Sequence, residues 1–234
     1  MSGMYVDIQK SNSFLRKVFL YMIFGIILSV GTPIVLSLVA PQLLQLAFQY
    51  YRVLVIVELI AVFTLSFRVY KMSSGTVKSI FILYSMLNGL TLCTIGFLFE
   101  PRIVLYSFGI AFGIFAVSAV YGFKTSEDLA SYSRFFKIGL VSLILVSLVN
   151  LWIGATSLYW MITIGGTVLF TGLIAYDVNR IRNISFYLAE EDGEDVEKYA
   201  VMGALSLYLD FINLFLYILR FSGRKDKYER WREK

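Results

Sequence analysis

Three carboxylates interrupt long apolar stretches of this sequence, and they are the side chains best suited to chemistry. Asp210 is the only charged residue in a stretch of 21 residues, and Glu58 is the only one in a stretch of 15. Asp177 directly follows the uncharged stretch Leu158–Tyr176. A carboxylate near the centre of a bilayer costs about 2.5–3.5 kcal/mol on insertion scales, so each of the three needs an explanation.

The sequence offers few other groups for chemistry. It contains no histidine, which excludes histidine metal sites and histidine-assisted nucleophiles, and its one cysteine, Cys93, lies in an apolar run. Proton chemistry must therefore use carboxylates, tyrosine, lysine or the backbone. Two carboxylates close together in a low dielectric cannot both ionise cheaply, so they share a proton and titrate as a coupled pair. Such a pair is a proton switch that works without histidine.

The residues around Asp210 form a polar stripe along one side of a predicted helix. Steps of three and four residues from Asp210 reach small or polar positions, namely Gly203, Ser206, Asn213 and Tyr217. We expect this stripe to face other helices or a water-filled path, with Ser206 and Asn213 lining it. A hydrogen-bonded packing seam is the alternative, but asparagine would serve a seam without a charge.

Asp177 and Glu58 each have a structural explanation as well. Asp177 stands at a helix end, where it can reach water or pair with Arg180 three residues later. Glu58 can be an acid that extends toward the membrane surface, and otherwise its partners come from other helices. Arg68 closes the same span ten residues further on, too far along the helix for a direct pair with Glu58.

The composition requires lipid around the protein. Of the 234 residues, 58% are apolar and 16% are charged, with a mean hydropathy of +0.74. Soluble domains have about 45–50% apolar and about 25% charged residues, and a globule of this size could not bury so much apolar chain. We therefore expect an integral membrane protein surrounded by lipids, and neither a soluble enzyme nor a nucleic-acid-binding domain.

Apolar runs predict an all-α protein with seven transmembrane helices in a single domain, residues 1–234, because about 20 apolar residues span the hydrocarbon core. We expect a break after the first span at Pro41 and a turn between the fifth and sixth spans at Gly154. The first run is too long for the core of a signal peptide, so we interpret it as a retained helix. The predicted spans are 18–39, 53–67, 79–99, 103–123, 138–154, 158–176 and 199–219, followed by a short basic tail at 220–234.

The basic residues indicate the orientation. The N-terminus and three alternate loops carry 12 Lys and Arg residues, whereas the loops on the other face carry 2, and this excess places the N-terminus in the cytoplasm. The tail from Arg220 has 7 basic residues, which favour the cytoplasm although seven crossings would put the tail outside. Either the last segment is re-entrant or the earlier charges fix the topology, and we favour the second explanation.

Two further patterns have mainly structural interpretations. Six of the eight residues in Glu190–Glu197 are acidic, but an EF-hand aligned on Gly193 would have Leu188 and Tyr199 at ligand positions, so the calcium-loop motif fails. We interpret this run as a solvated charged segment that raises the local concentration of cations. Gly109 and Gly113 have the spacing of a close-packing motif between membrane helices.

Three segments carry a resemblance to a known family. The stretch MGALSLYLDFINLFLYILRF at Met202–Phe221 resembles the signature of the Bax inhibitor-1 family, the transmembrane Bax-inhibitor-motif proteins. Ile174–Ile181, with the sequence IAYDVNRI, is similar to the aspartate motif of that family, and Phe115–Leu129 is similar to the exit of its fourth span. The likeness covers about three-quarters of the chain, and the short length resembles that of prokaryotic members.

The resemblance implies a seven-helix bundle with the last helix at the centre and a pH-sensitive calcium leak across the cell membrane. It implies that Asp177 and Asp210 are the facing aspartates of the pH sensor and gate, and that Glu58 and Arg68 correspond to a latch. Calcium is then a transported ion that the two aspartates bind transiently, and we expect no cofactor. Our hypothesis is that a shared proton holds the last helix closed and that its loss opens the path.

Three other functions compete with a leak channel. An intramembrane aspartyl protease would use two aspartates on consecutive spans, but its Gly-x-Gly-Asp and Pro-Ala-Leu motifs are absent, so we expect no enzyme. A proton-coupled transporter would have helices broken at Pro33 or at Gly165 and Gly166. A non-conducting scaffold or stress regulator would use the basic tail to bind anionic lipid or another membrane protein.

Overall fold

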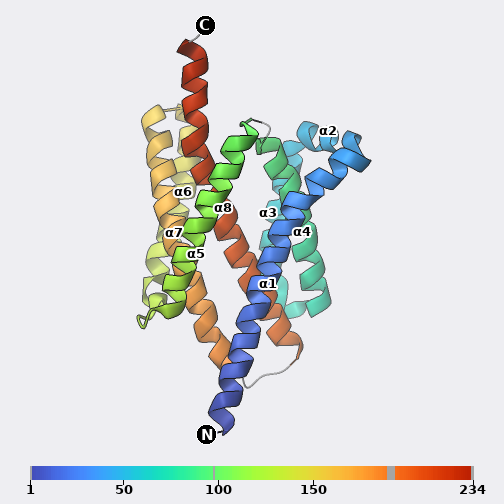
Figure 1. Cartoon of the computed structure of the whole chain (residues 1–234), viewed down its shortest axis with the longest axis vertical. Coiled ribbons are helices and arrows are strands. Elements are labelled where there is room, and N and C mark those ends of the chain that lie inside the picture. The colour runs from blue at the N-terminus through green and yellow to red at the C-terminus, as the bar shows by residue number, and fades with distance from the viewer. Residues whose placement is uncertain (1, 97, 189–192, 233–234) are drawn as a thin grey trace. The chain divides into compact units, whose positions relative to one another are not determined.

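The computed structural model describes residues 2–96, 98–188 and 193–232, and all of its regular elements there are helices (Figure 1). The predicted all-α class is confirmed. Two short 3₁₀ turns, η1 (Val69–Lys71) and η2 (Leu129–Tyr132), join longer helices. The α-helices are α1 (Ser2–Val39), α2 (Pro41–Gln49), α3 (Tyr51–Arg68), α4 (Ser74–Gly96), α5 (Pro101–Lys124), α6 (Ser133–Ile153), α7 (Thr156–Tyr187) and α8 (Glu194–Arg232).

Six helices are long and apolar enough to cross a membrane, namely α1, α4, α5, α6, α7 and α8. Helices α2 and α3 meet at an angle of 85° and count as a seventh span only if the bent pair is taken as one. The helix α3 alone is short and carries three charged residues, Arg52, Glu58 and Arg68. The expectation of seven spans therefore becomes six, or up to seven, over the described residues.

Proline and glycine end the helices where the sequence predicted breaks. The helix α1 ends at Val39, and Pro41 is the first residue of α2. At that position the backbone N–H would have no acceptor within the helix, so proline loses no hydrogen bond there. Gly154 follows α6 in a left-handed conformation, with φ of 65°, which glycine adopts at little cost. In contrast, Pro33 lies inside α1, and α7 continues through Gly165 and Gly166. None of these three residues ends its helix.

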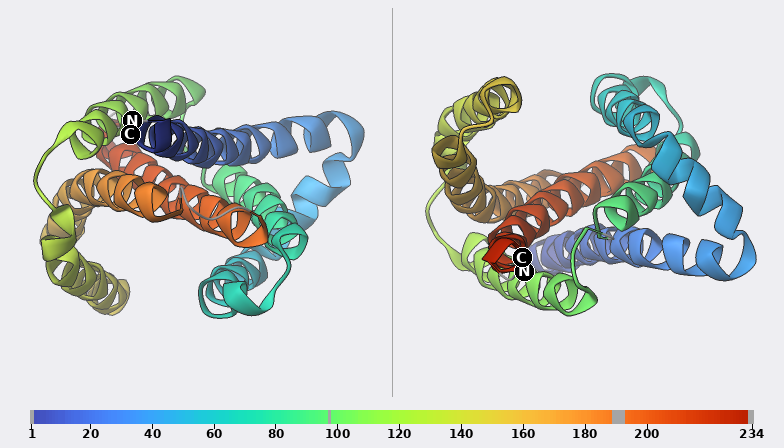
Figure 2. Two further views of the ribbon diagram at one scale, coloured as in Figure 1. Left: turned by 90° about the horizontal axis from the view of Figure 1, so that it is seen from below. Right: turned by 90° about the horizontal axis from the view of Figure 1, so that it is seen from above.

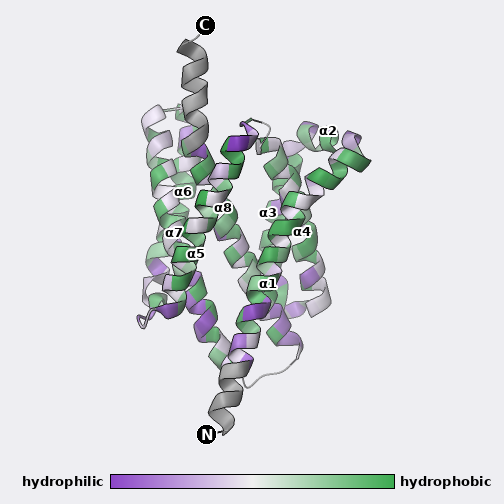
Figure 3. Ribbon diagram, in the orientation of Figure 1, coloured by the Kyte–Doolittle hydropathy of each residue, from purple (hydrophilic) through white to green (hydrophobic). Residues whose placement is uncertain are grey.

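The surface of the helices is largely apolar, as a lipid environment requires. Hydrophobic residues occupy most of the length of the helices, and hydrophilic residues gather toward their ends (Figure 3). Large side chains such as Leu38, Leu151 and Trp152 are more than three-quarters exposed. In water this arrangement would expose a contiguous apolar surface far larger than soluble monomers tolerate.

The chain forms two compact units, and the first comprises 1–98 and 183–208. Within it α1 packs along α4, and α3 packs on α4 as well. The α1–α4 contact is very close, because a Cβ atom on Gly89 would lie 2.4 Å from the carbonyl oxygen of Ser29. Phe81 and Tyr84 of α4 meet the ring of Tyr208 edge to face, which brings the first half of α8 into the same core.

A charged cluster ties three helices together at one end of this unit. The carboxylate of Glu197, at the start of α8, pairs with Lys17 of α1 and with Lys78 of α4, and the Lys78 Nζ–Glu197 Oε2 distance is 2.8 Å. The hydroxyl of Tyr21 also donates to Glu197 Oε2, at 3.0 Å. Lys17 lies in the first half of α1 and Lys78 in the first turns of α4, so the chain segment between them returns to the level of Lys17.

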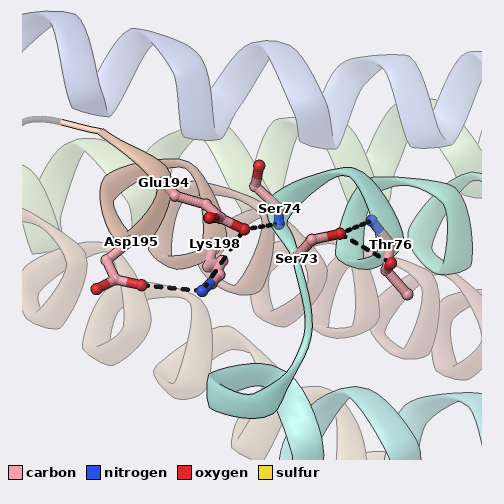
Figure 4. Close-up of polar contacts among 6 residues, drawn as sticks. All are labelled: Ser73, Ser74, Thr76, Glu194, Asp195 and Lys198. Carbon is pink, nitrogen blue, oxygen red and sulfur yellow. Dashed lines mark hydrogen bonds and ion pairs between the residues drawn. The ribbon is translucent and has the colours of Figure 1, made fainter.

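Two neighbouring acids in the first turn of α8 make further contacts beside this cluster (Figure 4). Glu194 Oε1 accepts a hydrogen bond of 2.7 Å from the backbone N–H of Ser74, the first residue of α4. Asp195 pairs with Lys198 at 3.0 Å within α8. Carboxylates at a helix N-terminus also interact favourably with the helix dipole. The acids of this segment that the structure describes, Glu194, Asp195 and Glu197, therefore form specific contacts in addition to being solvated. Glu190, Glu191 and Asp192 lie outside the described residues.

We predict that Glu197→Gln lowers the free energy of unfolding in detergent by about 1 kcal/mol, because it removes both ion pairs from a partly exposed network. The difference from the wild type should shrink in high salt, which screens surface charges. Thermal unfolding at low and high salt measures both effects. Asp195→Asn is the matched control, because the Asp195 side chain is 70% exposed and should contribute little. An equal loss in both variants would contradict a specific role for Glu197.

The second unit comprises 99–182 and 209–234. Here α5 and α7 approach so closely that a Cβ atom on Gly122 would lie 2.2 Å from the carbonyl oxygen of Ala175. The helix α6 lies beside α7 (Figure 2), with contacts through Gly139 and Phe136. None of the residues of α6 is buried. The predicted packing motif is not at this contact, because no described atom lies within 4 Å of a Cβ built on Gly109 or Gly113.

Candidate functional site

Asp177 and Asp210 meet in the second unit. Asp177 lies on α7 and Asp210 lies on α8, and the two residues are 9% and 6% exposed. Their carboxyl groups are in direct contact, close enough for a hydrogen bond from one to the other. A carboxyl group donates a hydrogen bond only when it holds a proton, so a hydrogen bond between these two acids requires that one of them be protonated.

Aromatic packing holds the α8 side of the pair. Phe211, next to Asp210 in the chain, is 1% exposed and meets the rings of Phe108 and Phe115 of α5 edge to face, with centroids 5.3 and 5.8 Å apart. Such edge-to-face pairs add about 0.5–1.5 kcal/mol each beyond the burial of area. These contacts of Phe211 therefore hold α8 against α5 at the level of Asp210.

Hydrogen bonds to loop backbone hold the α7 side. Asn179, two residues after Asp177, is fully buried and donates to the carbonyl oxygen of Gly122 at 3.2 Å. Its Oδ1 accepts from the backbone N–H of Leu129 at 3.3 Å. Arg182 donates to the carbonyl oxygens of Phe123 and Thr125. The helix α7 is thus fastened to the end of α5 within two turns of Asp177.

The two acids have unequal surroundings. Arg180, one turn further along α7, is exposed and interacts with the Asp177 carboxylate through its charge. Asp210 is more deeply buried, and its Oδ2 has no hydrogen-bond partner among the described residues. A buried carboxyl oxygen without a donor is costly in the ionised form. Asp210 therefore depends on a positive charge, such as a proton, more than Asp177 does.

The polar stripe of α8 is less distinct than the sequence predicted. Ser206 and Asn213 are half-buried, whereas apolar residues on other faces, including Leu207 and Leu214, are fully buried. The Asn213 side chain donates to the carbonyl oxygen of Leu209 in its own helix, at 2.8 Å. The helix is buried on most sides, so its sequence does not reveal which face matters. Within the predicted stripe, Asp210 is the residue that meets a partner acid.

Glu58 and Arg68 are not brought together. Glu58 is 8% exposed and accepts hydrogen bonds from Asn88 and Thr91 of α4, with an Asn88 Nδ2–Glu58 Oε2 distance of 3.2 Å. Arg68 is exposed at the end of the same helix, about 15 Å further along its axis. A direct Glu58–Arg68 latch is therefore not present in this structure.

Sequence reasoning missed the neutral polar residues that hold the helices around these acids. Asn88, Tyr208 and Asn179 are buried and hydrogen-bonded between elements far apart in the sequence. The available signal was weak, because uncharged polar residues are common in membrane helices. Asn88 is flanked by apolar residues and Asn179 lies in the segment that resembles the aspartate motif of the family.

The described residues contain no group of three or more His, Cys, Asp or Glu side chains able to hold a metal ion. Calcium ordinarily takes six to eight oxygen ligands. The two aspartates alone supply fewer oxygen ligands than that.

Known proteins resemble this chain over most of its length. Residues 11–227 match the family described as "Inhibitor of apoptosis-promoting Bax1". The inner membrane protein YbhL of Escherichia coli (strain K12) is 37% identical over 172 residues, 74% of each chain. An uncharacterized protein of Borreliella burgdorferi is 36% identical over 221 residues, 94% of this chain and 95% of the relative. An uncharacterized membrane protein of Streptococcus pyogenes serotype M1 is 36% identical over 171 residues, 73% of each chain. With the apolar helices, these relatives indicate a multi-pass membrane protein.

Proposed function

The chain belongs to the Bax inhibitor-1 family, and from that membership we propose that it is a calcium leak channel gated by protonation of the Asp177–Asp210 pair. The observation that carries the proposal is the direct contact of these two buried carboxyl groups. We propose no enzymatic activity and no cofactor. Calcium and protons are the ligands, and calcium is cargo.

The proton shared by the pair keeps the path closed. With one proton, the two carboxyl groups carry a single negative charge and attract each other through a hydrogen bond. Without it, two like charges face each other in a low dielectric, where their repulsion is far stronger than in water. Repulsion and hydration then separate Asp177 and Asp210, so calcium flux should rise as pH rises through the titration of the pair.

The ionised pair attracts calcium because it carries two negative charges. Two ionised carboxylates supply oxygen ligands and a negative potential, which a divalent cation reduces while it passes. Asn179 and Phe211 hold α7 and α8 against α5 on either side of the pair. The gating motion is then the separation of two side chains between helices that remain in place.

The test is calcium flux in proteoliposomes that contain the purified protein and a calcium-sensitive dye. Wild-type flux should increase from mildly acidic to mildly alkaline buffer, by at most about tenfold per pH unit if one proton is released. Empty vesicles measure the background. Flux that does not change with pH would contradict gating by the pair. Uptake against a calcium gradient would indicate a proton-coupled transporter, and no flux at any pH would favour a non-conducting scaffold.

We place the protein in the cell membrane with its N-terminus in the cytoplasm. The basic end of α1 supports this orientation, because Lys10, Arg16 and Lys17 precede the apolar part of the helix. Lys78 meets the same carboxylate as Lys17, so the start of α4 belongs to the same face. A cysteine-accessibility assay on intact cells, with a cysteine introduced at each of these lysines, tests this assignment.

A further inference from the structure

Five polar side chains from four helices form one buried network in the first unit, which we call the Glu58 network. Its members are Ser29 of α1, Glu58 of α3, Asn88 and Thr91 of α4, and Tyr208 of α8, and each is less than one-tenth exposed. The hydroxyl of Tyr208 donates to Asn88 Oδ1 at 2.8 Å and lies 2.6 Å from the hydroxyl of Ser29. Asn88 and Thr91 donate to the two carboxylate oxygens of Glu58.

The donors to Glu58 are neutral. No Lys or Arg of the described residues forms an ion pair with it, and its hydrogen bonds come from an amide and a hydroxyl. Tyr84 and Tyr208 are the ionisable groups that face it, and Cys93 lies two residues beyond Thr91 on α4. Other charged residues of α1, α3, α4 and α8 lie further along the helix axes, among them Arg16, Lys17, Arg52, Arg68, Lys78, Glu194, Asp195, Glu197, Lys198 and Asp210. The helix α2 has no ionisable side chain.

A carboxylate in this position is incompletely stabilised. Two neutral hydrogen bonds offset only part of the cost of removing an ionised carboxylate from water. Proton uptake by Glu58 removes the charge and gives one carboxyl oxygen an O–H group that needs an acceptor of its own. The Asn88 amide donates to one oxygen and the Thr91 hydroxyl to the other, so protonation weakens the hydrogen bond at the protonated oxygen and favours reorientation of that donor.

The reorientation reaches α8 through Asn88. This side chain bonds Glu58 with its amide nitrogen and Tyr208 with its amide oxygen, so a change at one end alters the geometry at the other. Tyr208 is fully buried and links α8 to α4 and α1. Tyr208 is also two residues before Asp210 in the same helix.

We propose that Glu58 is a second proton-binding site of this membrane protein, and that Asn88 transmits its protonation state to Tyr208 and so to α8. Proton binding at Glu58 is independent of the proposed channel activity. Its effect on calcium flux rests on that proposed function and acts through the aspartate pair, so it is absent from variants that lack the pair. Asp177 and Asp210 respond to the proton directly, whereas Glu58 acts on α8 through hydrogen bonds.

Infrared difference spectroscopy of the reconstituted protein tests the proton site without measuring flux. The background is Asp177→Asn with Asp210→Asn, which removes the carboxyls of the aspartate pair. In this background a carbonyl band of a protonated carboxyl should still titrate with pH, and Glu58→Gln should abolish it. Glu58→Asp, which keeps a carboxyl on a shorter side chain, should retain a titrating band with an altered midpoint. A spectrum that loses no titrating band on addition of Glu58→Gln would overturn the proposal.

Tyr208→Phe tests the transmission step. Removing its hydroxyl leaves Asn88 Oδ1 without its donor, which should move the midpoint of the Glu58 band by about half a pH unit or more, the effect of one neutral hydrogen bond. Tyr84→Phe is the matched control, because Tyr84 also faces Glu58 and packs edge to face on Tyr208. It removes a hydroxyl from the same core without removing one of the hydrogen bonds described for the Glu58 network. Equal shifts in both variants would overturn the transmission step. A normal Glu58 titration in a protein without calcium flux would contradict only the proposed function.

Discussion

Asp210→Asn alone should abolish the pH response of calcium flux as completely as Asp177→Asn and Asp210→Asn together. The reason is that the switch is one proton shared by two carboxyls. Removing either carboxyl removes the like-charge repulsion that opens the pair, and the remaining acid has a neutral amide as its partner. Two residues that act as a unit are expected to show strongly non-additive effects.

The measurement is the ratio of proteoliposome calcium flux in mildly alkaline buffer to that in mildly acidic buffer. The ratio should fall to about one in Asp177→Asn, in Asp210→Asn and in the double variant, because each removes the shared proton. Flux in all three should resemble the wild type at acidic pH, since asparagine imitates a protonated, uncharged acid. Additive losses, with each single variant keeping half of the response, would show that the two acids titrate independently.

Asp128→Asn is the matched control for this experiment. This substitution makes the same chemical change in the same unit. The Asp128 side chain, however, is exposed, and it caps η2 by accepting a hydrogen bond from the backbone N–H of Ala130. Asparagine caps helices as well as aspartate does, so the fold should be unaffected. Its pH response should therefore equal that of the wild type. A loss in this control would point to a nonspecific effect of surface charge.

Gly122→Val should destabilise the second unit by about 3 kcal/mol, the upper range for overpacking. A Cβ atom at this position would lie 2.2 Å from the carbonyl oxygen of Ala175 and 2.8 Å from its carbonyl carbon. Both atoms belong to backbone, so no side-chain rotation relieves the clash and α5 must move away from α7. That movement also strains the hydrogen bond from Asn179 to Gly122.

Thermal unfolding in detergent, followed by helical circular dichroism, measures the loss. Gly113→Val is the control on the same helix, because no described atom lies within 4 Å of its Cβ position. Valine at this exposed position inside α5 should leave the free energy of unfolding unchanged or raise it slightly, since glycine is a poor helix former. Similar melting temperatures for the two variants would show that the close α5–α7 contact does not contribute to stability.

The acids of the candidate site were predictable because ionised groups are costly in a membrane. A charge within an apolar run is conspicuous in one sequence, and this argument led to Asp177, Asp210 and Glu58. The same argument does not identify Asn88 or Tyr208, because the free-energy cost of inserting these uncharged residues into a membrane is small. Their role arises only from hydrogen bonds between helices that are far apart in the sequence.

Glycine spacing was a poorer guide, for a geometric reason. A small-residue motif indicates a surface where helices can approach, but it does not say whether a neighbour is there. Gly109 and Gly113 have the expected spacing and open space above them, whereas the close contact is at Gly122. The count of uncharged runs had a similar limit at α3. It predicted a membrane span there, but it could not reveal that α2 and α3 meet at an angle of 85°.

The lack of buried residues in α6 makes the host membrane a structural component of the second unit. With 21 residues, α6 is about 31 Å long, close to the hydrocarbon thickness of a typical bilayer. The side of α6 away from α7 meets the bilayer, so a thinner or thicker membrane favours a different tilt, at a cost of only fractions of a kcal/mol per Å of mismatch. The acyl-chain length of the surrounding phospholipids therefore sets the inclination of this helix, and the choice of lipid belongs among the controlled variables of reconstitution.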